Sequence, residues 1–142
     1  MIRKIILIIV VIGVVLFVLA QLVPYGRNHT NPPVVQEIQW DSPETLALAR
    51  RACYDCHSNE TVWPWYSNVA PASWLLAADT TDARNSMNFS EWGSRSQPAQ
   101  VNVRQIEEGR MPPSRYTALH PESRLTAAEK AQLVAGIQAS MP

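Results

Sequence analysis

The sequence has only two cysteines among its 142 residues, Cys53 and Cys56, and they stand three positions apart. A disulfide framework needs more cysteines at wider spacing, so this pair is expected to serve a local chemical site rather than to stabilise the fold through disulfides. The chain also lacks an excess of positive charge, because from Pro24 onward ten basic residues face twelve acidic ones. This balance argues against nucleic acid as a partner.

Both cysteines belong to the run Cys53-Tyr54-Asp55-Cys56-His57, and the Cys-x-x-Cys-His pattern is typical of covalent attachment of a c-type haem. In such a site the thiols add to the haem vinyl groups, and the imidazole binds the iron from one face. We therefore expect one covalently attached haem c, held by Cys53 and Cys56, with His57 as an axial ligand of the iron.

The same run is compatible with three alternatives to a haem site. A thioredoxin-like redox site would follow the buried strand of a βαβ unit, and nothing before Cys53 has that pattern. A zinc site needs a fourth ligand, and the adjacent Cys56 and His57 are awkward to place around one tetrahedral ion. The third alternative is a chance match in a protein that binds nothing.

An uninterrupted apolar run extends from Ile5 to Ala20, and at about 1.5 Å per residue it approaches the roughly 30 Å hydrocarbon thickness of a bilayer. Arg3 and Lys4 precede the run and only Arg27 follows closely, so the positive-inside rule predicts a cytoplasmic N-terminus and an exported domain. The alternative is a cleaved signal peptide ending near Ala20, although the run exceeds the usual signal core of roughly 7 to 15 residues. Both interpretations suit a haem that is attached outside the bacterial cytoplasmic membrane.

The remaining signals predict three regions: a transmembrane anchor or uncleaved signal over 1–23, a flexible linker over 24–40 and a haem-binding domain over 41–142. Ser42-Pro43 begins a helix with Ser42 as N-cap, and this helix ends at the haem motif. Further helices are expected over 71–79, over 98–108 with Gly109 as its C-terminal cap, and after the capping box Thr126–Glu129.

Aromatic residues are concentrated after the motif. Haem is a flat apolar disc, so aromatic rings can shield it, and indole N–H groups can donate to its propionates; the same rings could also be ordinary core residues. The haem-pocket candidates are Trp63, Trp65, Tyr66, Trp74, Trp92 and Tyr116. From Pro24 onward every basic residue except Lys130 is arginine, the side chain better suited to holding carboxylates such as propionates.

The second axial ligand is predicted in the run Gly109-Arg110-Met111-Pro112-Pro113. Methionine is a soft thioether donor for haem iron, and the prolines fix the backbone beside Met111. Taken alone, a methionine before two prolines is usually a packing residue, but the presence of a haem makes Met111 the favoured ligand. His120 is the alternative ligand, and ligation by two histidines would lower the reduction potential relative to His/Met.

These motifs together resemble the haem-binding domain family, short membrane-anchored proteins related to c-type cytochromes. The matching residues are the Cys-x-x-Cys-His-Ser run, the Trp63–Ser67 block, Asn88-Phe89-Ser90 with Trp92, Met111-Pro112-Pro113, Tyr116 and His120-Pro121. The family often has Gly-Arg before the Asn-Phe-Ser block, where this chain has Ala83-Arg84. The resemblance implies an all-α, small single-haem cytochrome c-like domain with long loops, preceded by one transmembrane helix. It also implies that the C-terminal helix packs against residues 43–53.

The expected function is that of a one-electron carrier, anchored as a single-pass protein in the bacterial inner membrane. Its domain would face the periplasm or the cell exterior, and its redox protein partners would lie outside the cytoplasm. A haem-based sensor or small-ligand binder is the alternative, and it would need a displaceable sixth ligand. A peroxidase-like enzyme is a further alternative, and it would need an open iron face and a polar acid–base group such as His120. We expect an electron carrier rather than an enzyme.

Overall fold

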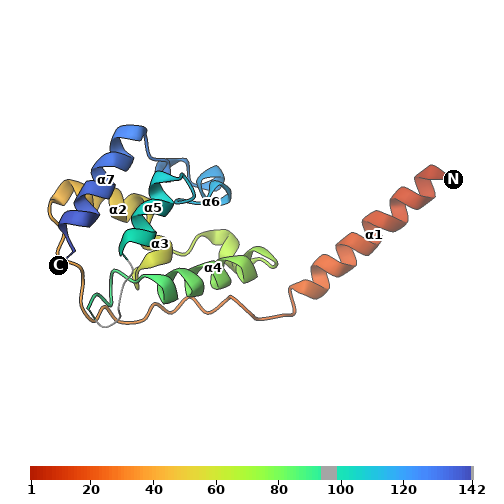
Figure 1. The fold of residues 1–142 in the computed structure, drawn as a ribbon. Coiled ribbons are helices and arrows are strands. Elements are labelled where there is room, and N and C mark those ends of the chain that lie inside the picture. The colour runs from red at the N-terminus through yellow and green to blue at the C-terminus, as the bar shows by residue number, and fades with distance from the viewer. Residues whose placement is uncertain (94–98, 142) are drawn as a thin grey trace. The chain divides into compact units, whose positions relative to one another are not determined.

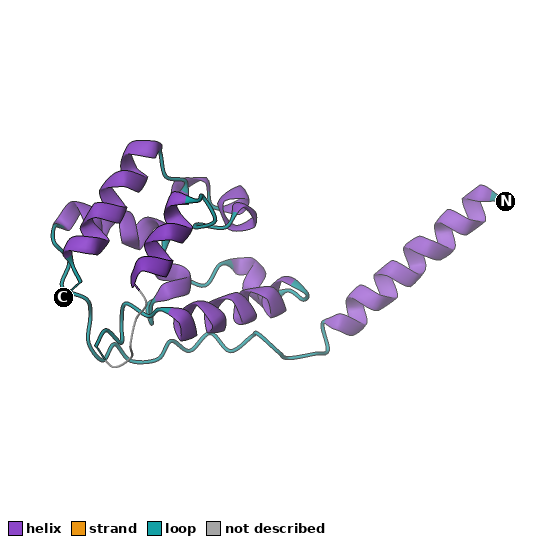
Figure 2. Ribbon diagram, in the orientation of Figure 1, coloured by secondary structure: helices purple, strands orange, loops and turns teal. Residues whose placement is uncertain are grey.

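The computed structural model of the chain describes residues 1–93 and 99–141. Its helices, in chain order, are α1 (Ile2–Ala20), α2 (Pro43–Ala52), α3 (Tyr54–His57), η1 (Trp65–Asn68), α4 (Ala72–Ser86), α5 (Ala99–Glu107), α6 (Ser114–Leu119), η2 (Pro121–Ser123) and α7 (Ala127–Ala139) (Figure 1). The described residues form no strand, and one isolated bridge joins Gln36 to Glu91 (Figure 2). The prediction of an all-α fold with an N-terminal apolar helix is therefore confirmed.

The chain forms two compact units. The first contains Met1–Thr30 and Trp63–Asp79, and the second contains Asn31–Val62 and Thr80–Pro142. The haem motif, Met111 and His120 all belong to the second unit.

The first unit contains α1, a helix of 19 residues that is long and apolar enough to cross a membrane. No residue of α1 is buried. A signal sequence has the same properties, so both interpretations of the apolar run agree with this helix.

The second unit is built around the packing of α7 against α2 and α5 (Figure 1). The predicted contact between the C-terminal helix and residues 43–53 is thus confirmed. Ser42 caps α2, with its Oγ accepting from the Thr45 N–H at 3.2 Å, and Pro43 is the first helical residue. The capping box of Thr126 and Glu129 begins α7. Both helix starts are where the sequence predicts them.

Two helix boundaries differ from the sequence prediction. The helix expected over 71–79 continues to Ser86 as α4, because the residues after Asp79 include no glycine or proline that would end it. The helix expected over 98–108 is α5, although its predicted first residue, Pro98, lies outside the described residues. Gly109 follows α5 with a φ of 70°, the left-handed conformation that the predicted cap requires.

Part of the segment that the sequence assigns to a linker packs into the second unit. The N–H groups of Val35 and Gln36 donate to the Ser90 carbonyl at 2.9 and 3.1 Å, and the Ile38 N–H donates to the Phe89 carbonyl at 3.1 Å. Ile38 is only 2 % exposed and joins the core cluster of Phe89 and Leu133. Residues 35–38 therefore support the segment that follows α4.

Candidate haem site

The haem motif is a tight turn at the end of α2. Cys53 is both the C-terminal cap of α2 and the residue before α3. Its N–H donates to the Ala49 carbonyl at 2.8 Å, and its carbonyl accepts from the His57 N–H at 2.8 Å. Because these bonds fix the backbone on both sides of Cys53, the two cysteines and the histidine are supplied by one rigid stretch of chain.

The imidazole of His57 is buried and held in one tautomer. Its Nδ1 lies 3.2 Å from the Met87 carbonyl oxygen, and a carbonyl can only accept, so Nδ1 carries the proton. Burial lowers the pKa of His57, although the carbonyls of Met87 and Ala83 oppose this effect. The ring is therefore neutral, with its lone pair on Nε2, which is the form that binds a metal.

The segment after α4 fixes the backbone of His57 as well as its ring. The Phe89 N–H donates to the His57 carbonyl at 2.8 Å, two residues after the carbonyl that accepts from Nδ1. Phe89 is fully buried against Tyr54, with ring centroids 5.5 Å apart. Met87 thus orients the ring of His57, and Phe89 of the Asn-Phe-Ser block holds its backbone.

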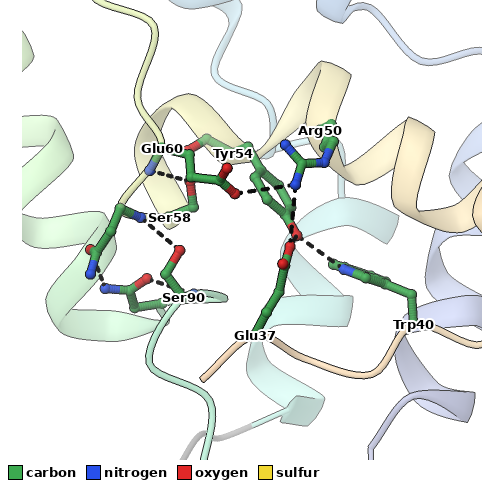
Figure 3. A network of polar contacts seen from close by, with 9 residues as sticks. Glu37, Trp40, Arg50, Tyr54, Ser58, Glu60 and Ser90 are labelled. Carbon is green, nitrogen blue, oxygen red and sulfur yellow. Dashed lines mark hydrogen bonds and ion pairs between the residues drawn. The ribbon is translucent and has the colours of Figure 1, made fainter. Parts of the chain in front are cut away.

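Buried amides lock this segment onto the residues after the motif. Asn88 donates from Nδ2 to Asn59 Oδ1 at 2.8 Å, and its own Oδ1 accepts from the Ser90 N–H at 3.0 Å. The Asn59 N–H donates to Ser90 Oγ at 2.9 Å, so the two segments are cross-linked by side chains rather than by a sheet (Figure 3). All three side chains are nearly inaccessible to solvent, which makes each bond costly to lose.

Arg84 in α4 holds the loop that follows His57. Its Nε donates to the Ser58 carbonyl and its Nη2 to Thr61 Oγ1, both at 2.8 Å. Nη2 also donates to Asn31 Oδ1 at 3.1 Å. The Ala83-Arg84 pair, where the family often has Gly-Arg, lies within continuous helix, and its arginine is a structural donor.

Tyr54, the first residue between the cysteines, is anchored by a polar cluster. Its hydroxyl donates to Glu37 Oε1 at 2.5 Å and accepts from Trp40 Nε1 at 3.0 Å. Arg50 lies over the ring, 4.7 Å from its centroid, and bridges the carboxylates of Glu37 and Glu60 (Figure 3). Burial and the bond to Glu37 raise the pKa of Tyr54, so the hydroxyl remains a donor at every physiological pH.

Asp55, the second residue between the cysteines, is held by Tyr116, a residue distant from it in the sequence. Tyr116 in α6 donates its hydroxyl to Asp55 Oδ2 at 2.5 Å, and the Val62 N–H donates to Asp55 Oδ1 at 3.0 Å. His120 stacks on Tyr116 with ring centroids 4.3 Å apart, and its Nδ1 lies 3.1 Å from Glu122 Oε1. The Tyr116 and His120 motif residues are thereby brought together with the haem motif.

Met111 follows the Gly109 turn in the same unit as the motif. Its N–H donates to the Gln105 carbonyl at 3.1 Å, and its side chain is half-buried against the core cluster that Cys53 and Trp92 also contact. Ligation of iron by Met111, or by His120 in its place, stays a prediction.

No disulfide joins Cys53 and Cys56 in the described structure. Burial raises the pKa of Cys53 to about 12, and the neighbouring Cys56 adds to this effect. The described residues contain no strand, so they lack the βαβ unit that a thioredoxin-like site would need. Among the described residues, no three His, Cys, Asp or Glu side chains lie together where they could hold a metal ion.

The other pocket candidates lie in the first unit. Trp63 stacks on His29 with centroids 4.7 Å apart, and Trp65 meets Tyr66 edge to face at 5.8 Å. Trp74 has a buried indole Nε1 without a hydrogen-bond acceptor among the described residues. Their roles toward a haem, like that of Trp92 in the second unit, stay predictions.

Several residues that position the motif were missed by sequence reasoning. They are Glu37, Trp40, Tyr54, Asn59 and Arg84. Tyr54 lies within the motif and Asn59 follows it closely, so their positions in the sequence could have identified them as residues that support it. Glu37 and Trp40 stand in a segment without regular pattern, and only the fold brings them to Tyr54.

Comparison with known proteins identifies a family. A family model described as a haem-binding domain matches residues 15–139. No curated protein and no solved structure is significantly similar to this chain.

Proposed function

Because the chain belongs to the haem-binding domain family, we propose that it is a c-type haem protein that carries one electron at a time outside the cytoplasmic membrane. The observation that carries the proposal is the orientation of His57. A buried, neutral imidazole whose Nδ1–H donates to the Met87 carbonyl keeps the lone pair of Nε2 for binding a metal.

The residues of the second unit fit a covalently held haem. Cys53 and Cys56 are not joined by a disulfide and would form the two thioether bonds, and His57 would bind the iron from one side. When bound, the haem supplies an iron that takes up and releases a single electron. The protein's own contribution is to hold the ligand ring still and to exclude water, and the bonds from Met87 and Phe89 serve the first of these tasks.

Met111 is the second axial ligand in this proposal. Its thioether would leave the iron with six ligands, which suits electron transfer better than the binding of small molecules. His120 is less suited to this role, because its ring is already stacked on Tyr116 and its Nδ1 contacts Glu122. Its position beside Tyr116 supports a structural role in the loop that reaches Asp55.

The N-terminal helix is the anchor in this proposal. α1 has 19 apolar or flanking residues and none is buried, so nothing in its own unit covers the surface that a bilayer would cover. The haem domain would then remain at the outer surface of the membrane and exchange electrons with redox proteins there.

The full-length protein, expressed with the machinery that attaches haem c, provides the test. Intact mass should equal the chain plus one haem with α1 retained, and titration of the membrane-bound protein should fit a single one-electron step. Replacing both Cys53 and Cys56 by Ala should abolish covalent haem. A protein with no covalent haem, or a haem that does not cycle reversibly, would contradict the proposal.

A further inference from the structure

A stretch of the first unit combines aromatic residues with a complete lack of charge. Residues 63–78 contain three tryptophans and one tyrosine, and no Asp, Glu, Lys or Arg. Within it, Trp65 is 80 % exposed and Leu75 is 57 % exposed. Apolar side chains that are exposed together, without charges among them, are typical of sites that contact a membrane or another protein.

This stretch is bonded to the end of α1. Gln21, the C-terminal cap of α1, donates from Nε2 to the Ala70 carbonyl at 3.0 Å and accepts from the Ala70 N–H at Oε1, also at 3.0 Å. Arg27 donates to the same Oε1 at 3.1 Å. The paired bonds of one amide side chain to one residue's backbone fix residue 70 at the point where the apolar helix ends.

The residues after Gln21 continue along the same stretch. Ser73 Oγ donates to the Tyr25 carbonyl at 3.4 Å. Gly26 has a φ of 77°, and a Cβ there would overlap the Ser73 carbonyl, so the two backbones touch at a position that only glycine permits. Further along, His29 Nε2 lies 3.2 Å from the Ser67 carbonyl oxygen. Contacts of both backbone and side chains therefore hold the stretch beside the exit of α1.

We propose that Tyr25, Trp65 and Leu75 form a lipid-docking surface that lies on the bilayer crossed by α1. The inference rests on the anchor role proposed above, because α1 sets the distance of the surface from the membrane. The occupant is lipid, since the surface is attached to the end of the membrane-crossing helix and offers no charge to a protein partner. Tyrosine and tryptophan are the residues enriched at this depth, where an apolar ring can be buried while its polar edge stays hydrated.

Hydroxyl-radical footprinting of the full-length haem protein in phosphatidylcholine nanodiscs tests the proposal. The chain supplies a matched pair, because Leu75 is 57 % exposed and Leu119, in the second unit, is 64 % exposed. With the side chain in the headgroup–acyl boundary, Leu75 should be oxidised at least about fivefold more slowly than Leu119. Trp65 should be protected likewise, despite its 80 % exposure.

Equal oxidation of Leu75 and Leu119 in a protein whose α1 is protected by the nanodisc would overturn the docking surface and leave the anchor intact. A protein whose α1 is itself oxidised, or which does not enter nanodiscs, would overturn the anchor and the docking surface together. The Gln21→Leu variant provides a second measurement, because it keeps an apolar helix end but removes the paired bonds to Ala70. Protection of Leu75 should fall in this variant while that of α1 stays, and unchanged protection would contradict the proposed link.

Discussion

Three residues of the haem motif are held by separate sets of partners. Tyr54 is held through its hydroxyl by Glu37 and Trp40, and Asp55 is held by Tyr116. His57 is held by the carbonyl of Met87. The two residues between the cysteines thus fix the motif to the rest of the domain. These contacts are made by the protein alone, without a ligand.

The bond between Tyr116 and Asp55 should contribute measurably to stability. Tyr116→Phe removes a donor to a carboxylate at 2.5 Å, and hydrogen bonds to charged groups contribute about 1.5–3 kcal/mol to stability. Urea unfolding of the haem protein should report that loss, and Tyr25→Phe, at an exposed tyrosine, is the matched control. A change for Tyr116→Phe no larger than that of the control would show that this contact does not hold the motif.

Asn88 should be the most sensitive polar residue of the segment that orients His57. Asn88→Ala would leave Asn59 Oδ1 and the Ser90 N–H without their partner in a buried place, at a cost of about 2–4 kcal/mol. Asn68→Ala, at an exposed asparagine, should change the free energy of unfolding by less than about 0.5 kcal/mol. Denaturant unfolding measures both, and similar values for the two variants would show that the bonds of Asn88 to Asn59 and Ser90 do not stabilise this segment.

At the scale of elements, the contact between α2 and α7 depends on one glycine. A Cβ at Gly136 would overlap the side chain of Thr45 and lie 2.8 Å from Asp41 Oδ1. The helices can approach so closely only because that Cβ is absent. Since α2 ends at Cys53, the same contact supports the start of the haem motif.

Gly136→Ala therefore provides a test in which two effects oppose each other. Alanine raises helix propensity by about 1 kcal/mol, whereas overpacking costs about 1–3 kcal/mol. The contact lies among buried residues of two packed helices, so we expect a net loss of roughly 1 kcal/mol in unfolding free energy. Thr45→Ala should restore part of the loss in the double variant. A Gly136→Ala protein more stable than the natural one would contradict this packing.

Two helix starts and one helix end were predictable because they depend on residues close by in the sequence. Ser42 and Thr126 accept bonds from N–H groups three residues ahead, and Gly109 takes the left-handed conformation that follows a helix. The extension of α4 to Ser86 was missed because no stop signal follows Asp79 and periodicity alone does not set a boundary. The tautomer of His57 could not be predicted, since it depends on a carbonyl thirty residues away.

For the whole molecule, the sequence indicated an N-terminal apolar segment, either an anchor or a signal, and a haem-binding domain; α1 is apolar and residues 15–139 match the haem-binding domain family, whereas the boundaries of the three regions stay predictions. The division into two units was not foreseen. Residues 63–79 join the N-terminal part through bonds such as that of Gln21 to Ala70, which no pattern in either segment signals. Long-range side-chain pairs of this kind are set by the fold.

We propose that Met111 completes a six-coordinate haem that carries electrons, and the absorption spectrum of the haem protein tests this ligation directly. The oxidised protein should show the charge-transfer band of methionine-ligated iron, and the reduced protein should not bind carbon monoxide readily. Met111→Leu should abolish the band, whereas Met141→Leu, at a partly buried methionine near the C-terminus, should leave it unchanged. An oxidised protein without the band, whose reduced form binds carbon monoxide at once, would contradict the account and favour a sensor of small ligands.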